Sequence, residues 1–305
     1  MTKYFFPILS WVPATEQRIE RLPFTFEPRR WDVTIFDLYS LIAERHPLRM
    51  TAELMQIFLP GASMEISVEA EDHSSACRLL DTIRAMLCSQ AEMTPTLAPF
   101  ATSYSINEYA GINSRSSNLL RDKLPEGLRD GITANDARVE GWPTELSLMC
   151  IRGDQQTLKN RLTGVDFVAA ADAALLWQDI ENRHSTARTL RMALAKAPLM
   201  PDMSSSILHM WQALESLFNI DREVTYRTSL LLAEMCATVE TRAITYAAAK
   251  KSYADRSKIA HGSSAPVDTI KWMRAWSLLR NAARAVLLRN AVPSAGELTD
   301  ELLQR

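Results

Sequence analysis

Glycine and cysteine are scarce in this chain, and long apolar runs are missing. The 305 residues include nine glycines, and none of them belongs to a phosphate-binding loop of the Walker or dinucleotide type. The four cysteines, Cys77, Cys88, Cys150 and Cys236, form no C-x-x-C pair, so they indicate neither a disulfide framework nor a zinc site. We therefore expect buried free thiols, no metal and no cofactor.

The chain has no run that approaches the ~18 apolar residues needed to cross a bilayer. Its first residues are interrupted by Pro7 and Pro13, and they do not follow the layout of a secretory signal peptide. The sequence therefore predicts a cytoplasmic protein that makes no contact with a membrane.

Charge is distributed unevenly, although the formal net charge is only −2. Residues 1–150 contain 14 basic and 20 acidic side chains, a net −6, whereas residues 151–305 contain 20 basic and 16 acidic ones, a net +4. This asymmetry favours the second half as the part that nucleic acid approaches.

The first half mixes strand and helix patterns, which predicts an α+β domain. Residues 64–70 alternate apolar and acidic side chains, as in a half-exposed strand. A helical pattern follows over residues 75–90, with Ser74 and Ser75 as candidate N-caps, and another covers residues 36–44. Strand-like patterns occur at residues 100–112 and 145–151, and residues 113–143 have the composition of turns and short strands.

From Phe167 onward the pattern is helical with short breaks, which predicts an all-α bundle. We expect six helices. They start near Phe167, at Ser185 or Thr186, at Pro201-Asp202, at Glu223, at Val239 and at Val267. Gly262 suits the left-handed cap that ends the fifth helix. We place the boundary near residue 155, between an α+β domain of residues 1–155 and a helical domain of residues 156–305.

The stretch YADRSKIAHG, residues 253–262, pairs Arg256 with His261 at the end of a predicted helix. Arginine carries a permanent charge and histidine titrates near neutrality, so the two offer a fixed cation beside a proton donor or acceptor. This combination is sufficient for cleaving a phosphodiester without a metal.

Three blocks, taken in order, resemble the Apea-like branch of the HEPN superfamily. They are Ala213-Leu214-Glu215, Tyr226-Arg227 and the string Arg256-Ser257-Lys258-Ile259-Ala260-His261-Gly262. The resemblance covers about residues 167–290 and does not extend to the first half. It implies a helical fold, a homodimer, and a metal-independent endoribonuclease of prokaryotic anti-phage defence that responds to a phage or host trigger.

The motif residues acquire roles under this interpretation. His261 would move the proton of the RNA 2′-hydroxyl or of the leaving 5′-oxygen, and Arg256 would stabilise charge on the scissile phosphate. The resemblance implies that Glu215 orients the arginine or the histidine. Ser257 and Lys258 would contact phosphate.

Structural roles remain open for each of these residues. His261 also fits a helix C-cap, Arg256 a surface ion pair, and Glu215, Ser257 and Lys258 a solvated helix surface. Five residues along an ideal helix separate Arg256 and His261 by ~140°, so the two side chains of one chain do not face the same site. Two chains paired about a two-fold axis could place both residues at one site. The alternative function is a catalytically inactive module that binds RNA or another protein.

Overall fold

The computed structural model describes residues 1–29, 58–99, 101–102, 139–140, 150–220, 222–262 and 266–304. The chain divides into two compact units, each built from several stretches. The first unit comprises Met1–Leu80, Thr96–Leu146 and Asn160–Val168, and the second comprises Asp81–Pro95, Ser147–Lys159 and Ala169–Arg305. Around the predicted boundary at residue 155, the chain therefore enters the second unit, returns to the first and enters the second again.

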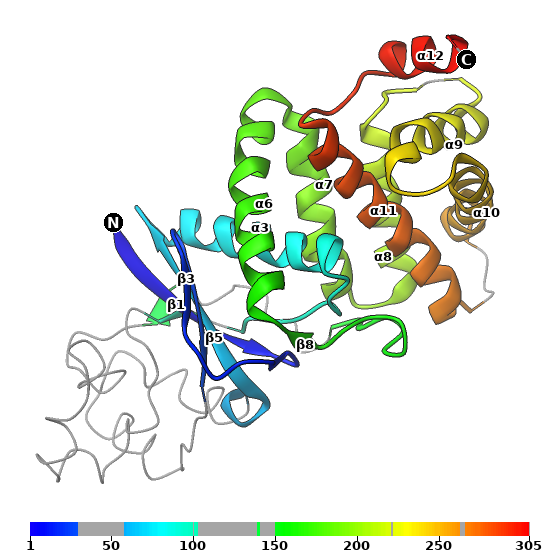
Figure 1. Cartoon of the computed structure of the whole chain (residues 1–305). Helices are drawn as coiled ribbons and strands as arrows, with labels where there is room; N and C mark the ends of the chain where they lie inside the picture. Colours follow the sequence, from blue (N-terminus) through cyan, green and yellow to red (C-terminus); the bar gives the residue numbers. More distant parts are fainter. Residues whose placement is uncertain are drawn as a thin grey trace, which may run out of the picture. The chain divides into compact units, whose positions relative to one another are not determined.

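The first unit contains a six-stranded antiparallel sheet with the strand order β3, β4, β5, β1, β6, β7, of which Figure 1 labels β1, β3 and β5. A separate parallel pair joins β2 to β8. The strands are β1 (Thr2–Leu9), β2 (Val12–Pro13), β3 (Ile19–Arg21), β4 (Phe24–Pro28), β5 (Ala62–Ala70), β6 (Ala101–Thr102), β7 (Val139–Glu140) and β8 (Arg161–Leu162).

Strand β5 confirms the strand predicted at residues 64–70, but it is not half exposed. It lies between β4 and β1, so both of its edges are paired. Ile66 and Val68 are fully buried, and Glu65 is only 2% exposed because its carboxylate faces Arg29, with Oε1 3.8 Å from Nε. The alternation correctly predicted a strand, and the expectation that its acidic face meets solvent was wrong at Glu65.

Helix α3 (His73–Gln90) confirms the helix expected after this strand, with a different cap. Asp72 accepts a hydrogen bond from the Ser75 backbone N–H at 2.7 Å, so Asp72, and neither Ser74 nor Ser75, caps the helix. The helix expected at residues 36–44 lies outside the described residues. So do the patterns at residues 113–143 and 145–151, except for 139–140 and 150–151.

The second unit is helical and follows the predicted order closely (Figure 1). Its helices are the C-terminal parts of α3 and α6 (Gly164–Arg183), then α7 (Ser185–Lys196), α8 (Met203–Ser216), α9 (Val224–Met235), α10 (Arg242–Ala260), α11 (Thr269–Arg289) and α12 (Ala295–Leu303). Short 3-10 turns follow α7, at Ala197–Leu199, and α9, at Cys236–Thr238. The layout is thus a small α+β part followed by a helical part.

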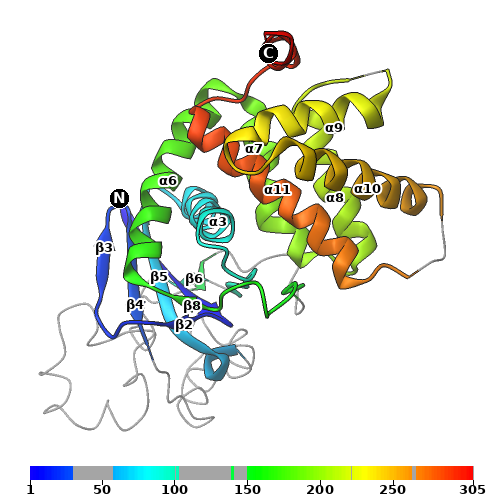
Figure 2. The same cartoon turned by 45° about the vertical axis from the view of Figure 1, so that its right-hand side comes forward.

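Helix α11 is the central helix of this unit and packs against α7, α8, α9 and α10 (Figure 2). Trp272 and Trp276 are fully buried and stack at 5.2 Å between ring centroids. The Trp272 indole N–H donates to the Ser206 hydroxyl at 2.8 Å, and that hydroxyl donates to the Ala197 carbonyl at 2.7 Å. The Trp272 indole and the Ser206 hydroxyl are therefore satisfied in the core, whereas the Trp276 indole N–H is buried without a hydrogen-bond partner among the described residues.

The helix starts agree with the expected caps in part. Asp202 caps α8, accepting from the backbone N–H groups of Ser204 and Ser205. His184, rather than Ser185 or Thr186, occupies the N-cap position of α7, and it makes no side-chain capping bond. Gly262 has φ +77° directly after α10, which confirms the left-handed cap predicted there.

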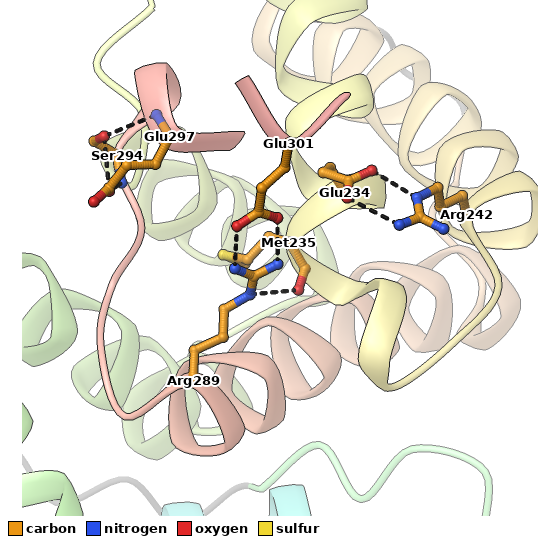
Figure 3. A network of polar contacts seen from close by, with 7 residues as sticks. All are labelled: Glu234, Met235, Arg242, Arg289, Ser294, Glu297 and Glu301. Atoms are coloured by element: carbon orange, nitrogen blue, oxygen red, sulfur yellow. Dashed lines mark hydrogen bonds and ion pairs between the residues drawn. The ribbon is translucent and has the colours of Figure 1, made fainter. Parts of the chain in front are cut away.

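Helix α12 was not predicted from the sequence. A capping box begins it, in which the Ser294 hydroxyl accepts from the Glu297 backbone N–H and the Glu297 carboxylate accepts from the Ser294 backbone N–H. Two bonds, 2.8 and 2.9 Å long, join Arg289 of α11 to Glu301 and hold α12 in place (Figure 3). The S-x-x-E spacing is the signal that could have revealed this helix.

No helix among the described residues is both long enough and apolar enough to cross a bilayer.

Candidate functional site

The motif of residues 253–262 forms the last two turns of α10 and its C-terminal cap. The chain buries a narrow stripe of small side chains on this helix, Thr245, Ala249 and Ser252. Small residues at these spacings allow α10 to lie close to α8 and α9, which it contacts. The polar motif residues therefore occur at the edge of the packed core.

Arg256 and Glu215 meet, although 41 positions separate them in the sequence. Arg256 Nη2 donates to Glu215 Oε2 at 3.0 Å, and the two side chains are 29% and 24% exposed. Because both are mostly shielded, this pair is held more firmly than an ion pair in open solvent. Arg256 Nε is buried and makes no hydrogen bond with the described residues.

Tyr253 completes the surroundings of Arg256. The guanidinium carbon lies 5.5 Å from the tyrosine ring centroid, a cation–π distance, and the ring packs edge-on to Trp211 at 5.1 Å. Burial raises the pKa of Tyr253, and the negative charge of Glu215 raises it further. Thr225 of α9 acts on the Tyr253 hydroxyl in the opposite sense and lowers its pKa, so side chains of α8, α9 and α10 converge here.

His261 occupies the C-cap position of α10 and is exposed. Its backbone N–H donates to the Ser257 carbonyl at 3.1 Å. Five residues separate it from Arg256, which turns the two side chains ~140° apart about an ideal helix. The structure thus brings Glu215 and Arg256 together, and it leaves His261 at the exposed end of the same helix.

The remaining motif positions are on the helix surface. Lys258 is exposed and Ser257 is half-buried. Tyr253 and Ile259 are partly buried. Lys258 is therefore accessible to an anion, and the hydroxyl of Ser257 is partly so.

The structure contains a second ion pair near the motif that the sequence analysis did not predict. Arg274 of α11 donates to Asp255 of α10 at 2.7 Å, with both side chains about 15% exposed. No local pattern reveals this contact, because its two residues are on different helices. The pair ties the C-terminal part of α10 to α11.

The basic residues of α11 do not form a free stripe. Arg274, Arg280 and Arg289 are each engaged with a carboxylate, of Asp255, Glu92 and Glu301 respectively. These three arginines are therefore not free to act together on an RNA backbone. The cations close to the motif that remain exposed include Lys250, Lys251 and Lys258.

Within the part of the chain that the structure describes, no three His, Cys, Asp or Glu side chains are grouped as a metal site would require. All four cysteines are free thiols; Cys88 and Cys236 are buried as expected, whereas Cys77 and Cys150 are only half-buried. Burial raises the pKa of Cys88 and of Cys236 to about 12 and that of Cys150 to about 11. These three cysteines are therefore protonated and unreactive near neutral pH.

Comparisons with protein-family models, curated proteins and solved structures gave no match to this chain. A functional proposal for this chain therefore depends on the geometry of the motif and its neighbours.

Proposed function

We propose that the helical part of this chain is an Apea-like HEPN domain and a metal-independent endoribonuclease. The observation that carries the proposal is the ion pair between Glu215 and Arg256. The family resemblance implies that the acid of the first block orients a residue of the third. Two blocks so far apart in sequence have no local reason to meet, so their contact supports a common site.

The proposed reaction is an intramolecular transfer at phosphorus. The RNA 2′-oxygen attacks the adjacent phosphorus as its proton leaves, and the bond from phosphorus to the 5′-oxygen breaks as that oxygen gains a proton. The products are a 2′,3′-cyclic phosphate and a 5′-hydroxyl end. His261 moves one of these protons, and the Arg256 guanidinium stabilises the charge on the non-bridging oxygens.

Arg256 suits this role because its ion pair with Glu215 uses a single Nη–H bond. A guanidinium has five N–H donors, so several remain for a phosphate. Glu215 and the Tyr253 ring hold the guanidinium in one orientation, which reduces the entropy lost on binding. Lys258, exposed in the last turn of the helix, and Ser257 would contact neighbouring phosphates.

We further propose that two copies of the chain assemble the site. Arg256 and His261 extend from different sides of α10. A two-fold axis near the end of this helix would place the Arg256 and His261 side chains of both chains around one shared site. The first half of the chain would then sense a phage or host trigger and restrain or target the nuclease. RNA is the expected partner, and the cytoplasm is the expected location.

The test is cleavage of total cellular RNA in the presence of a chelator, with the product ends mapped. We expect His261→Ala to reduce the cleavage rate by ~10²–10⁴-fold, as for the loss of an acid–base group. Arg256→Ala should reduce it by ~10²–10³-fold, as for the loss of an electrostatic stabiliser. Arg188→Ala, which alters an exposed arginine on α7, is the matched control and should cleave like the wild type.

Undiminished cleavage by His261→Ala would refute the proposed role of this residue. Cleavage by no variant, the wild type included, would direct the test to cells, where wild-type expression should be toxic and His261→Ala expression should not. Equal growth of the two strains would then contradict the nuclease.

The same ion pair favours a second candidate, a non-catalytic module that binds RNA or protein. Arg256 is held by Glu215 and packed on Tyr253, which is also the geometry of an arginine that stabilises the fold. Under this alternative, Arg256→Ala lowers the melting temperature while His261→Ala changes neither stability nor RNA processing. The two candidates therefore differ in the effect of the histidine variant.

A further inference from the structure

A cavity of about 770 Å³ lies in the helical unit between α11 and the segment of residues 153–158. This volume is within the range of pockets that hold small organic ligands. Gly153 makes the close approach of this segment possible, because it has φ +70° and a Cβ there would lie 2.7 Å from Met273 Sδ. The segment of residues 153–158 therefore packs closely against α11 and forms one wall of the cavity.

One face of α11 forms the other wall. Ile270, Met273, Ser277 and Arg280 recur at spacings of three and four, so they follow one stripe along the helix. Ten residues of helix span about 15 Å, which is long enough for an extended nucleotide. The stripe begins with apolar side chains, continues with a hydroxyl and ends with a cation.

Arg280 is the unusual member of this stripe. It is 5% exposed, and its Nη2 lies 2.9 Å from Glu92 Oε1 in an ion pair. Its Nε is buried and has no hydrogen-bond partner among the described residues. Its partner Glu92 is 50% exposed, so the ion pair joins a buried cation to a carboxylate side chain that is half in solvent. Nε is too deeply buried to meet a ligand, but the ion pair involves Nη2 alone and the guanidinium lines the cavity, so the N–H groups of Nη1 remain for an anion.

Asp154 also lines the cavity, but its carboxylate is engaged in its own turn. One oxygen accepts from the Gln156 backbone N–H at 3.0 Å, and the other accepts from the Thr157 hydroxyl at 3.3 Å. Gln155, Thr157, Thr269 and Ser277 add neutral polar groups to the lining, and Leu158 adds an apolar one. The lining therefore combines an apolar wall, neutral hydrogen-bonding groups, one buried cation, and the carboxylates of Glu92 and Asp154.

We propose that this cavity binds a nucleoside monophosphate. The phosphate would bind Arg280, the ribose hydroxyls would meet Ser277 and the neutral polar groups, and the base would lie against Ile270 and Met273. The three parts of the lining thus match the three parts of the ligand. This site shares no residue with the one built on Arg256, and it does not depend on ribonuclease activity.

The experiment is titration calorimetry of the full chain with adenosine 5′-monophosphate and, in parallel, with adenosine. Adenosine differs from the first probe by the phosphate alone. We expect the monophosphate to bind once per chain and adenosine to bind at least about tenfold more weakly, as for the loss of a charge-assisted bond to a buried cation. Equal affinities, or no saturable binding of the monophosphate at millimolar concentration, would overturn the proposal.

Substitutions locate the site. Arg280→Met should abolish the preference for the monophosphate over adenosine, and Ser277→Phe should weaken both probes because its ring fills the cavity. Ser277→Ala is the matched control for the second variant and should bind like the wild type to within about threefold. Circular dichroism and melting curves establish that each variant is folded.

Glu92→Gln gives an independent result because the Glu92 side chain is half exposed and the glutamine amide oxygen can still accept from Arg280. The substitution removes the negative charge that is paired with Arg280 and that repels the phosphate. The monophosphate should therefore bind more tightly. Unchanged or weaker binding by Glu92→Gln would contradict the assignment of the phosphate to Arg280.

Discussion

The buried carboxylate of Glu234 offers the sharpest test of how the helical unit is held together. Glu234 is completely buried on α9, and Arg242, the first residue of α10, donates two hydrogen bonds to it at 2.6 and 2.9 Å (Figure 3). An arginine in the first turn is unfavourable for the helix dipole, so its position is explained by this contact. Arg242 itself is 39% exposed.

The two partners should respond unequally to substitution. Arg242→Met removes the bidentate partner of a buried charge, which typically costs about 3–5 kcal/mol. The positive charge of Arg289 continues to act on Glu234, so we expect about 3 kcal/mol. Glu234→Gln leaves an arginine that water can reach, and it should cost only about 1–2 kcal/mol.

Urea unfolding followed by tryptophan fluorescence measures both free energies, with an unchanged slope as the check on two-state behaviour. The double variant Glu234→Leu with Arg242→Met should be more stable than Arg242→Met alone, because it buries no charge. Arg188→Met, an exposed arginine on α7, should stay within about 0.5 kcal/mol of the wild type. A smaller loss for Arg242→Met than for Glu234→Gln would refute the reasoning.

Three further predictions concern other contacts. The hydrogen bonds from Arg289 lower the pKa of Glu301 below 4.5, so this pair stabilises the fold above pH 4.5 and the stabilisation is lost as the pH falls through the lowered pKa. The difference in melting temperature between wild type and Glu301→Gln should accordingly shrink from about pH 6 to pH 3, and a constant difference would contradict the assignment. Gly153→Ala places a methyl group near Met273 in a left-handed backbone, so unfolding should cost about 1–3 kcal/mol less; an unchanged urea midpoint would refute this. Leu214→Ala, at a fully buried position, should cost about 2–5 kcal/mol in the same assay, and a loss below about 1 kcal/mol would contradict its place in the core.

Local patterns predicted the helices well because a helix depends on residues three and four positions apart. The stripe of Ile207, Met210, Trp211 and Leu214 is buried, and Asp202 caps its helix as expected. The left-handed residue after α10 was also predictable, since glycine adopts positive φ without a steric penalty. Where a local signal was overlooked, as in the capping box of Ser294, a helix was missed.

Burial and the caps of two helices were predicted less well. Glu65 was expected to face solvent because of the alternation in its strand, whereas pairing on both sides buried it. Asp72 and His184 occupy the N-cap positions and directly precede the serines and threonine that were predicted as caps. Where several polar residues follow one another, the backbone geometry decides which of them is the cap. The sequence supplies candidates in such cases, and the path of the chain selects among them.

The sequence by itself determined the order of the helices from α6 to α11, the end of α10 shortly before Gly262 and the presence of Arg256 and His261 near that end. Only the tertiary structure decided which charges meet. Glu215 reaches Arg256 from another helix, and Glu92 reaches Arg280 from a segment far earlier in the chain. Hydrophobic periodicity is a local property of the chain, but an ion pair across the fold depends on how every intervening helix packs.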